Sequence, residues 1–263
     1  MFEEAALRAL ILSTLAGLST MIGALVIVLI TKKDEKKNTK LVTVSLGFAA
    51  GVMISVSLTE LFPISHSSLT GFYGDTLGVI LSVIFLIAGM FLAAVIDRFV
   101  PHQDYDEKVG ESPHKNLFRV GVVSMLAIGL HNFPEGIATF MAGYENTTLG
   151  ISIAVAIAFH NIPEGIAVAM PIYFGSGSRK KAFGYTFLSG VAEPAGALLA
   201  FLALRPIMGE VVLGAVFSVV AGIMIYISVE ELIPSSRQYG HDRMALIATL
   251  SGIAIMPLTA IIS

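Results

Sequence analysis

Long apolar runs separated by short polar stretches make up the chain. The runs cover residues 5–30, 41–62, 76–96, 118–142, 149–174, 182–204, 209–233 and 244–262. Each is close to the roughly 20 residues that an α-helix needs to cross about 30 Å of hydrocarbon. The runs are continuously apolar, whereas the strands of a membrane β-barrel alternate apolar and polar residues. The pattern predicts an all-α membrane protein with eight transmembrane helices in a single domain, residues 1–263.

Composition agrees with this class of protein. The 263 residues are 55% hydrophobic and 13% charged, whereas a soluble domain carries roughly 25% charged residues. The first run follows an acidic start, Met1 to Glu4. Because a cleaved signal peptide begins with basic residues, we interpret this run as the first helix. The sequence has no cysteine, which excludes disulfides and thiolate ligands.

Basic residues are concentrated on one side of the predicted membrane. Fourteen of the 16 flank the odd-numbered connections: Lys32, Lys33, Lys36, Lys37, Lys40, Arg98, Lys108, Lys115, Arg119, Arg179, Lys180, Lys181, Arg237 and Arg243. Only Arg8 and Arg205 lie on the opposite side. Cytoplasmic connections carry an excess of lysine and arginine, so both termini are predicted to be extracytoplasmic. The protein is expected to be a multi-pass component of the cytoplasmic (inner) membrane.

Two internal repeats divide the chain. AGVMISVSLTELFPIS at 50–65 aligns without a gap to AGIMIYISVEELIPSS at 221–236, and LAGLSTMIGAL at 15–25 aligns more weakly to LSGVAEPAGAL at 188–198. Helices one and two therefore match helices six and seven, which cross the membrane in the opposite sense. This indicates an inverted repeat in a 3+2+3 arrangement, although helices three and eight show no convincing match. Inverted repeats are typical of secondary transporters, whose sites lie near the bilayer midplane.

A polar motif occurs twice inside the apolar runs. His131 to Gly136 reads HNFPEG in the fourth helix, and His160 to Gly165 reads HNIPEG in the fifth. Histidine and glutamate four residues apart share one face of a helix, and the asparagine lies on its flank. Proline removes a backbone donor and kinks the helix, and glycine allows a neighbouring helix to approach closely. Two facing helices would present imidazoles, carboxylates and amides to one point.

Carboxylates at this depth need a compensating cation. An ionised side chain at the bilayer centre costs at least about 2.5–3.5 kcal/mol, and Glu193 in the sixth helix adds a third glutamate. Nitrogen and oxygen ligands without sulfur favour zinc, iron(II), manganese or cobalt, and make magnesium or calcium unfavourable. The candidate metal ligands are His131, Asn132, Glu135, His160, Asn161, Glu164 and Glu193. The alternative is that these polar residues only bond to one another and pack the helices together. That would explain one motif, but it explains two copies poorly.

Further acidic residues lie nearer the ends of the helices. Glu60 is predicted near the outer end of the second helix, and Glu230 and Glu231 near the cytoplasmic end of the seventh. We interpret them as an entrance and an exit for ions, with solvated interfacial glutamates as the alternative, above all for Glu230. His102 and His114, in the third connection, have an open role, because isolated histidines in polar stretches are usually solvated.

The paired HNxPEG motifs, glutamate-proline in the sixth helix, eight runs and outward termini together resemble the ZIP family of divalent-metal transporters, over essentially the whole chain. The resemblance implies uptake of zinc, and also of iron(II), manganese or cobalt, through a binuclear site. It implies one ion at His131, Glu135, His160 and Glu164, and a second at Asn132, Glu135, Asn161, Glu164 and Glu193. Some relatives add a ligand where Glu60 lies. Many carry a histidine-rich third loop, which is reduced here to His102 and His114.

The alternative classes are an intramembrane metal-dependent enzyme and a metal sensor. A zinc protease would show HExxH and a diiron oxidase Glu-x-x-His pairs, and the sequence has neither. It also lacks the P-loop pattern of ATP-driven transport. We therefore expect no enzyme activity and no prosthetic group, with Zn²⁺ and other divalent ions as transported substrates. The expected partners are these ions and membrane lipid, without nucleic acid, and a homodimer stays an open alternative.

Overall fold

The structure, a computed structural model, describes residues 2–25, 27, 35–99, 114–204 and 209–259. Its helices are α1 (Phe2–Ala24), α2 (Glu35–Val56), α3 (Phe62–Tyr73), α4 (Asp75–Phe99), α5 (His114–Glu145), α6 (Thr147–Ser176), α7 (Arg179–Leu199), α8 (Glu210–Ile227), α9 (Ile233–Arg237) and α10 (Asp242–Thr259). Three π-helical turns, η2 (Ser57–Leu61), η3 (Ala200–Leu204) and η4 (Ser228–Leu232), continue α2, α7 and α8. These residues contain no strand, and the predicted all-α fold is confirmed.

Seven helical segments of the described residues are long and apolar enough to span a membrane. They are Glu4–Ala24, Thr39–Tyr73, Asp75–Arg98, Leu117–Tyr144, Gly150–Ser176, Arg179–Leu202 and Val211–Arg237. The protein is therefore a multi-pass membrane protein. The predicted eighth span, 244–262, falls on the 18-residue α10 and ends outside the described residues. Its crossing of the membrane stays a prediction.

The predicted end of the second span needs correction. The second span, predicted at 41–62, continues through η2 and α3 to Tyr73. Pro63 does not end it, because Pro63 lies in the first turn of α3, where a backbone N–H is not needed. The first span, predicted at 5–30, ends its α-helix at Ala24, and the rest of that range is only partly described.

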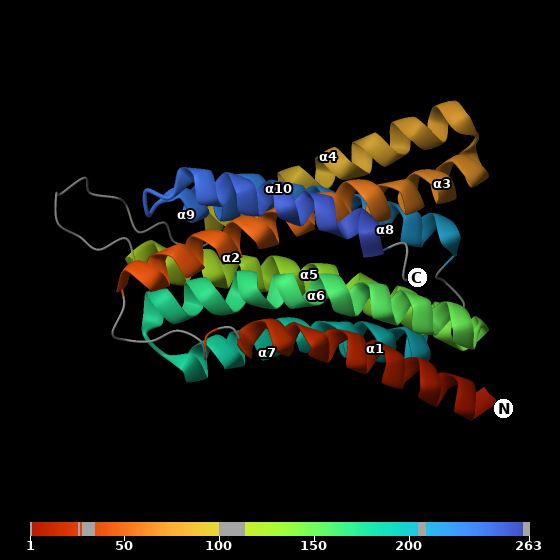
Figure 1. Cartoon of the computed structure of the whole chain (residues 1–263). Helices are drawn as coiled ribbons and strands as arrows, with labels where there is room; N and C mark the ends of the chain where they lie inside the picture. Colours follow the sequence, from red (N-terminus) through yellow and green to blue (C-terminus); the bar gives the residue numbers. More distant parts are fainter. Residues whose placement is uncertain (1, 26, 28–34, 100–113, 205–208, 260–263) are drawn as a thin grey trace.

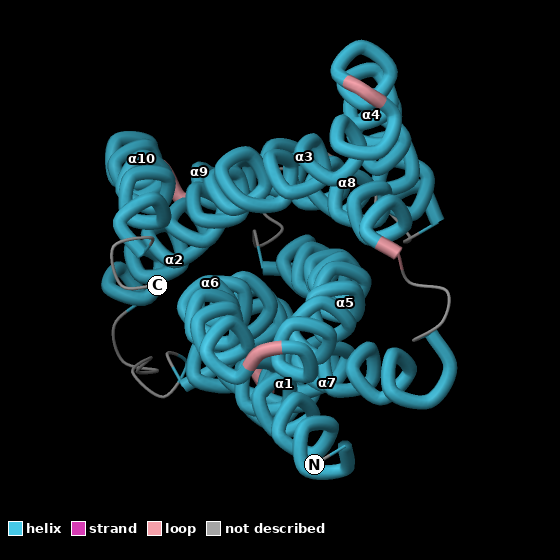
Figure 2. The backbone as a smooth tube through the Cα atoms, turned by 90° about the vertical axis from the view of Figure 1, so that its right-hand side faces the viewer, coloured by secondary structure: helices cyan, strands magenta, loops and turns pink. Residues whose placement is uncertain are grey.

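The helices form two groups that face each other (Figure 2). We call α1, α5, α6 and α7 the four-helix group, and α2, α3, α4, α8, α9 and α10 the six-helix layer. Contacts of α2 with α6 and of α5 with α8 join them. A buried apolar cluster that includes Met53 of α2, Met170 of α6 and Met224 of α8 spans the boundary. The start of α1 and the end of α10 lie at the same end of the molecule (Figure 1).

Glycines bring α2 and α10 into backbone contact. A methyl group added to Gly51 would collide with the carbonyl of Thr249. One added to Gly252 would collide with the carbonyl of Phe48. Only glycine permits backbones to approach so closely, so each helix fits against the other through a position without a side chain.

The same contact occurs between α8 and α4. A methyl group on Gly222, which matches Gly51 in the sequence repeat, would collide with the carbonyl of Leu86. One on Gly89 would collide with the carbonyl of Val219, which matches Phe48. The glycine contacts between α4 and α8 thus correspond to those between α10 and α2. The sequences of α4 and α10 show no convincing match.

The π-helical turns also occupy matching positions. Ser57–Leu61 and Ser228–Leu232 fall on the same letters of the repeat, and each precedes a proline-containing turn. The backbone N–H of Phe62 donates to the carbonyl of Ser57, and that of Ile233 donates to the carbonyl of Ser228. Glu60 and Glu231 therefore lie inside equivalent local distortions, which are frequent at functional sites.

Candidate metal centre

Both HNxPEG motifs lie inside continuous helices, HNFPEG in α5 and HNIPEG in α6. The seven predicted ligands are all buried: His131, Asn132, Glu135, His160, Asn161, Glu164 and Glu193, the last of them in α7. Buried polar side chains in such number are expensive unless each finds a partner. Their contacts therefore decide what the cluster can do.

The histidines and glutamates of the two motifs meet at Glu135. Its Oε1 lies 3.0 Å from Nε2 of His160 and 3.1 Å from Nε2 of His131. The same nitrogen of His131 lies 3.4 Å from Oε1 of Glu164. Ligand atoms of His131, Glu135 and His160 lie within 4.8 Å of one another. The structure thus brings together the four side chains that the family resemblance assigns to a first ion.

The asparagines extend the cluster toward α1 and α7. Nδ2 of Asn161 donates to Oε2 of Glu193 at 2.9 Å and to the carbonyl of Ala16 at 3.0 Å. Nδ2 of Asn132 donates to the carbonyl of Ser189 at 3.2 Å. With their amide nitrogens engaged, both asparagines present their carbonyl oxygens as the atoms left to coordinate a cation.

Several oxygens of the cluster make no hydrogen bond within the described part of the chain. They are Oδ1 of Asn132 and Asn161, Oε2 of Glu135, both carboxylate oxygens of Glu164 and Oε1 of Glu193. A buried acceptor without a donor costs about 1–3 kcal/mol, and more when it is charged. Coordination of divalent cations by these oxygens and the two imidazoles would satisfy them. The donor set therefore fits borderline metal ions such as zinc.

Glycines set the distance between the helices that carry the cluster. A methyl group on Gly136 would collide with the carbonyl of Glu193, and one on Gly165 with the carbonyl of Thr20. The glycines of HNxPEG therefore seat α5 against α7 and α6 against α1. Backbone contact at Gly136 places Glu193 directly beside the motif of α5.

Thr20 is a residue of this region that the sequence analysis did not single out. Its buried Oγ1 makes no hydrogen bond within the described residues. Thr20 matches Glu193 in the weaker repeat. A methyl group on Gly190 would lie 3.4 Å from Cβ of Thr20, and one on Gly17 would lie 2.9 Å from Cβ of Glu193. Thr20 thus occupies on α1 the place that Glu193 occupies on α7, a relation that the alignment of the repeat already contained.

The outlying acidic residues differ in their surroundings. Glu60 is half-buried in η2, near enough to His160 and Glu135 for their charges to interact. Its predicted place near the outer end of the second helix is wrong, because the span continues beyond it to Tyr73. Glu231 is buried in η4 and binds Arg119, while its neighbour Glu230 is exposed. His102 lies outside the described residues, and His114 is the first residue of α5.

Comparison with known proteins identifies the family of the chain. The sequence profile of the ZIP zinc transporter family matches residues 101–260. The chain is 46% identical over 260 residues to the zinc transporter ZupT of Streptococcus mutans, covering 97% of each protein. It is 48% identical over 269 residues to ZupT of Chlorobaculum parvum, covering 99% of each. ZupT of Clostridium perfringens is 42% identical over 277 residues, covering 97% of this chain and 96% of the relative. The chain therefore belongs to the ZIP family of zinc transporters.

Proposed function

We propose that this protein carries zinc across the cytoplasmic membrane into the cell. The observation that carries the proposal is the buried cluster on α5, α6 and α7, whose imidazoles, carboxylates and amide oxygens converge with acceptors left unpartnered. Membership of the ZIP family supports it, as do the curated relatives, which are named zinc transporters. These relatives are transporters rather than enzymes, in agreement with the missing HExxH motif.

The centre is proposed to hold two ions. His131, Glu135, His160 and Glu164 would bind the first, and Asn132, Glu135, Asn161, Glu164 and Glu193 the second. Two features support shared ligands: Oε1 of Glu135 already contacts both histidines, and both oxygens of Glu164 lack hydrogen bonds in the described residues. The same donor types also suit iron(II), manganese and cobalt, which we propose as further substrates.

We propose that the chain, as one domain of residues 1–263, is an inverted repeat in a 3+2+3 arrangement. Three observations support it: the matching π-helical turns, the matching glycine contacts of α2 with α10 and of α8 with α4, and the matching places of Thr20 and Glu193. On this proposal α4 and α10 are the third pair of equivalent helices, and α5 and α6 form the central pair.

The membrane potential would drive inward transport. The bias of basic residues favours outward termini, so an ion would pass Glu60 on its way to the centre and leave past Glu231. A potential of about 100 mV, negative inside, contributes roughly 4.6 kcal/mol for a doubly charged ion. This energy corresponds to about three decades of accumulation without ATP.

The test is zinc flux into proteoliposomes that contain the purified chain. Glu135→Ala and Glu164→Ala each remove a shared ligand, and we expect either change to abolish flux. Asp75→Asn, at the exposed start of α4, is the matched control and should transport normally. Undiminished flux in both alanine variants would refute the site. Absence of flux for any divalent ion in the unmodified chain would refute transport and favour the sensor.

A further inference from the structure

A buried ion network lies at the end of the molecule where α5 begins. Nη1 of Arg119 lies 3.0 Å from Oε1 of Glu231, and its Nη2 donates to Oδ1 of Asp97. The side chains of Arg119, Asp97 and Glu231 are 9%, 10% and 7% exposed. Breaking such a buried pair is expensive, because it leaves a charge without compensation. The network is thus a strong and specific connection.

The network joins the two helix groups. Arg119 lies in the second turn of α5, which carries HNFPEG in the four-helix group. Asp97 lies in the last turns of α4, and Glu231 in η4, both in the six-helix layer. A movement of α5 away from the layer larger than the reach of the Arg119 side chain would break these contacts. The network therefore links the position of the metal centre to the position of the layer.

The network also includes Glu231, the acidic residue at the proposed exit. A guanidinium on Oε1 of Glu231 occupies the atom that a departing cation would bind, and its positive charge repels that cation. An ion can use Glu231 only after Arg119 has released it.

We propose that Arg119 is a positioning residue of transport: it ties α5 to the six-helix layer and holds Glu231 paired until the two groups separate. The inference rests on the proposed transport function and adds to it a step at which release is controlled. Nothing in the ligand geometry of the centre requires Arg119. Its loss should therefore change the rate of release and leave zinc binding at the centre intact.

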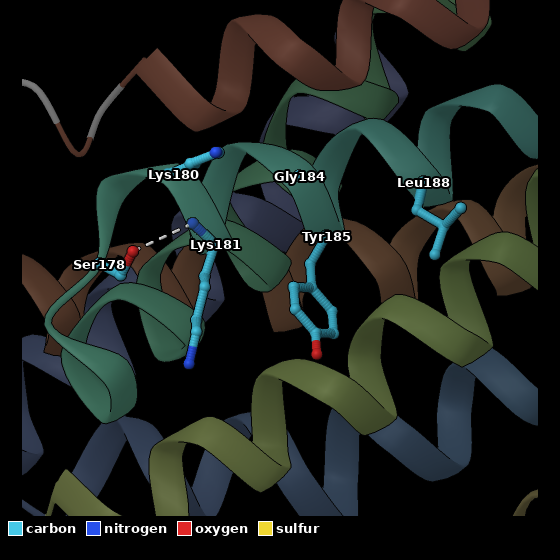
Figure 3. A pocket seen from close by; sticks show the side chains of 6 residues that line it. All are labelled: Ser178, Lys180, Lys181, Gly184, Tyr185 and Leu188. Atoms are coloured by element: carbon cyan, nitrogen blue, oxygen red, sulfur yellow. Dashed lines mark hydrogen bonds between the residues drawn. The ribbon is translucent and has the colours of Figure 1, made fainter.

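A neighbouring cation provides a matched control. Nζ of Lys181 in α7 lies 5.7 Å from the centre of the ring of Phe118. Phe118 is the residue directly before Arg119. Lys181 and Tyr185 line a hollow of about 420 Å³ together with Ser178, Lys180, Gly184 and Leu188 (Figure 3). The contact of Lys181 stays within the four-helix group. Lys181→Gln thus removes one positive charge beside the same turn of α5 without cutting a link between the groups.

The experiment measures the separation of the groups and the rate of transport in the same variants. The chain has no cysteine, so Lys180→Cys and Asp242→Cys, both at exposed positions, carry one spin label on each group. Arg119→Gln should add a second, longer distance to the distribution measured by double electron–electron resonance. Lys181→Gln should leave the distribution unchanged. Identical distributions in the parent and in Arg119→Gln would overturn the proposal.

Transport kinetics distinguish positioning from general damage. In Arg119→Gln we expect the maximal zinc flux to fall by about 10-fold or more. Zinc affinity at the centre should stay within about 2-fold of the parent. Arg119→Lys keeps the charge and should restore part of the rate. If Arg119→Gln does not fold, the double variant Asp97→Asn and Glu231→Gln removes both carboxylate partners of Arg119 in the six-helix layer and should shift the distances in the same direction. Unchanged distances in the double variant would also overturn the proposal. If the parent itself transports no ion, the proposed function fails, whereas the distances still test the link.

Discussion

Replacement of Gly136 by alanine tests whether backbone contact between α5 and α7 positions the second half of the centre. The added methyl group would overlap the carbonyl of Glu193. Carbon and oxygen in such contacts stay about 3.3–3.6 Å apart, so α5 and α7 must separate by on the order of 1 Å. Overpacking of this kind costs about 1–3 kcal/mol, partly offset by about 1 kcal/mol from the higher helix propensity of alanine.

The expected effect on zinc is larger than the effect on stability. Glu193 accepts a hydrogen bond from Asn161, and its displacement changes the surroundings of the proposed second ion. Loss of supporting contacts around a metal typically lowers affinity by about 10- to 100-fold. Titration calorimetry of the purified Gly136→Ala variant should therefore show one of two zinc-binding events, the one at the proposed second ion, lost or reduced by about that factor.

Gly129→Ala is the matched control on the same helix. A methyl group at Gly129 meets nothing within 4 Å, so this variant should be unchanged or up to about 1 kcal/mol more stable. Thermal unfolding in detergent gives the comparison of stability. Equal unfolding temperatures and equal zinc binding in the two variants would refute the argument that the contact at Gly136 positions Glu193.

Three further predictions concern the same region. Thr20→Glu should place a carboxylate opposite Glu193, and calorimetry and flux should show zinc bound at least about 10-fold more tightly but transported more slowly. A zinc affinity no higher than that of Thr20→Gln would contradict the correspondence of Thr20 with Glu193. Asn161→Leu should lower the number of zinc ions bound per chain, counted by elemental analysis, because Glu193 loses its donor and the second ion a ligand; an unchanged count would remove Asn161 from the site. Zinc at about 100 times its dissociation constant should stabilise the protein by about 2.7 kcal/mol, visible as a higher unfolding temperature that a chelator reverses, and an unchanged temperature would argue against a preformed site.

The sequence predicted those features that the membrane itself imposes. Helices of spanning length must be apolar, so the runs were visible, and the polar HNxPEG letters stood out against them. The meeting of His131 and His160 at Glu135 followed from the duplication of the motif. The end of the second span was misplaced because a proline after an apolar run is typical of a boundary, whereas Pro63 fits the first turn of the next helix.

Other features depend on contacts that no local pattern encodes. Arg119 was assigned to the basic residues that flank a connection, but it is buried between Asp97 and Glu231. Its partner in η4 is 112 positions away in the chain, and a single arginine near the start of an apolar run is typical of a membrane boundary. The proposed equivalence of α4 and α10 was not visible in the sequence for a similar reason, because lipid-facing positions accept almost any apolar residue. Only the glycine contacts support it.

The π-helical turns at 57–61 and 228–232 matter for anyone who designs labels or crosslinks in this protein. Each turn accommodates about one residue more than an α-helical turn, which rotates all later positions by roughly 100° relative to an unbroken helix. A helical wheel drawn from α2 through α3 would therefore assign residues such as His66 to the wrong side. Reporter groups beyond these turns must be chosen from the three-dimensional structure, counting anew from Phe62 and Ile233.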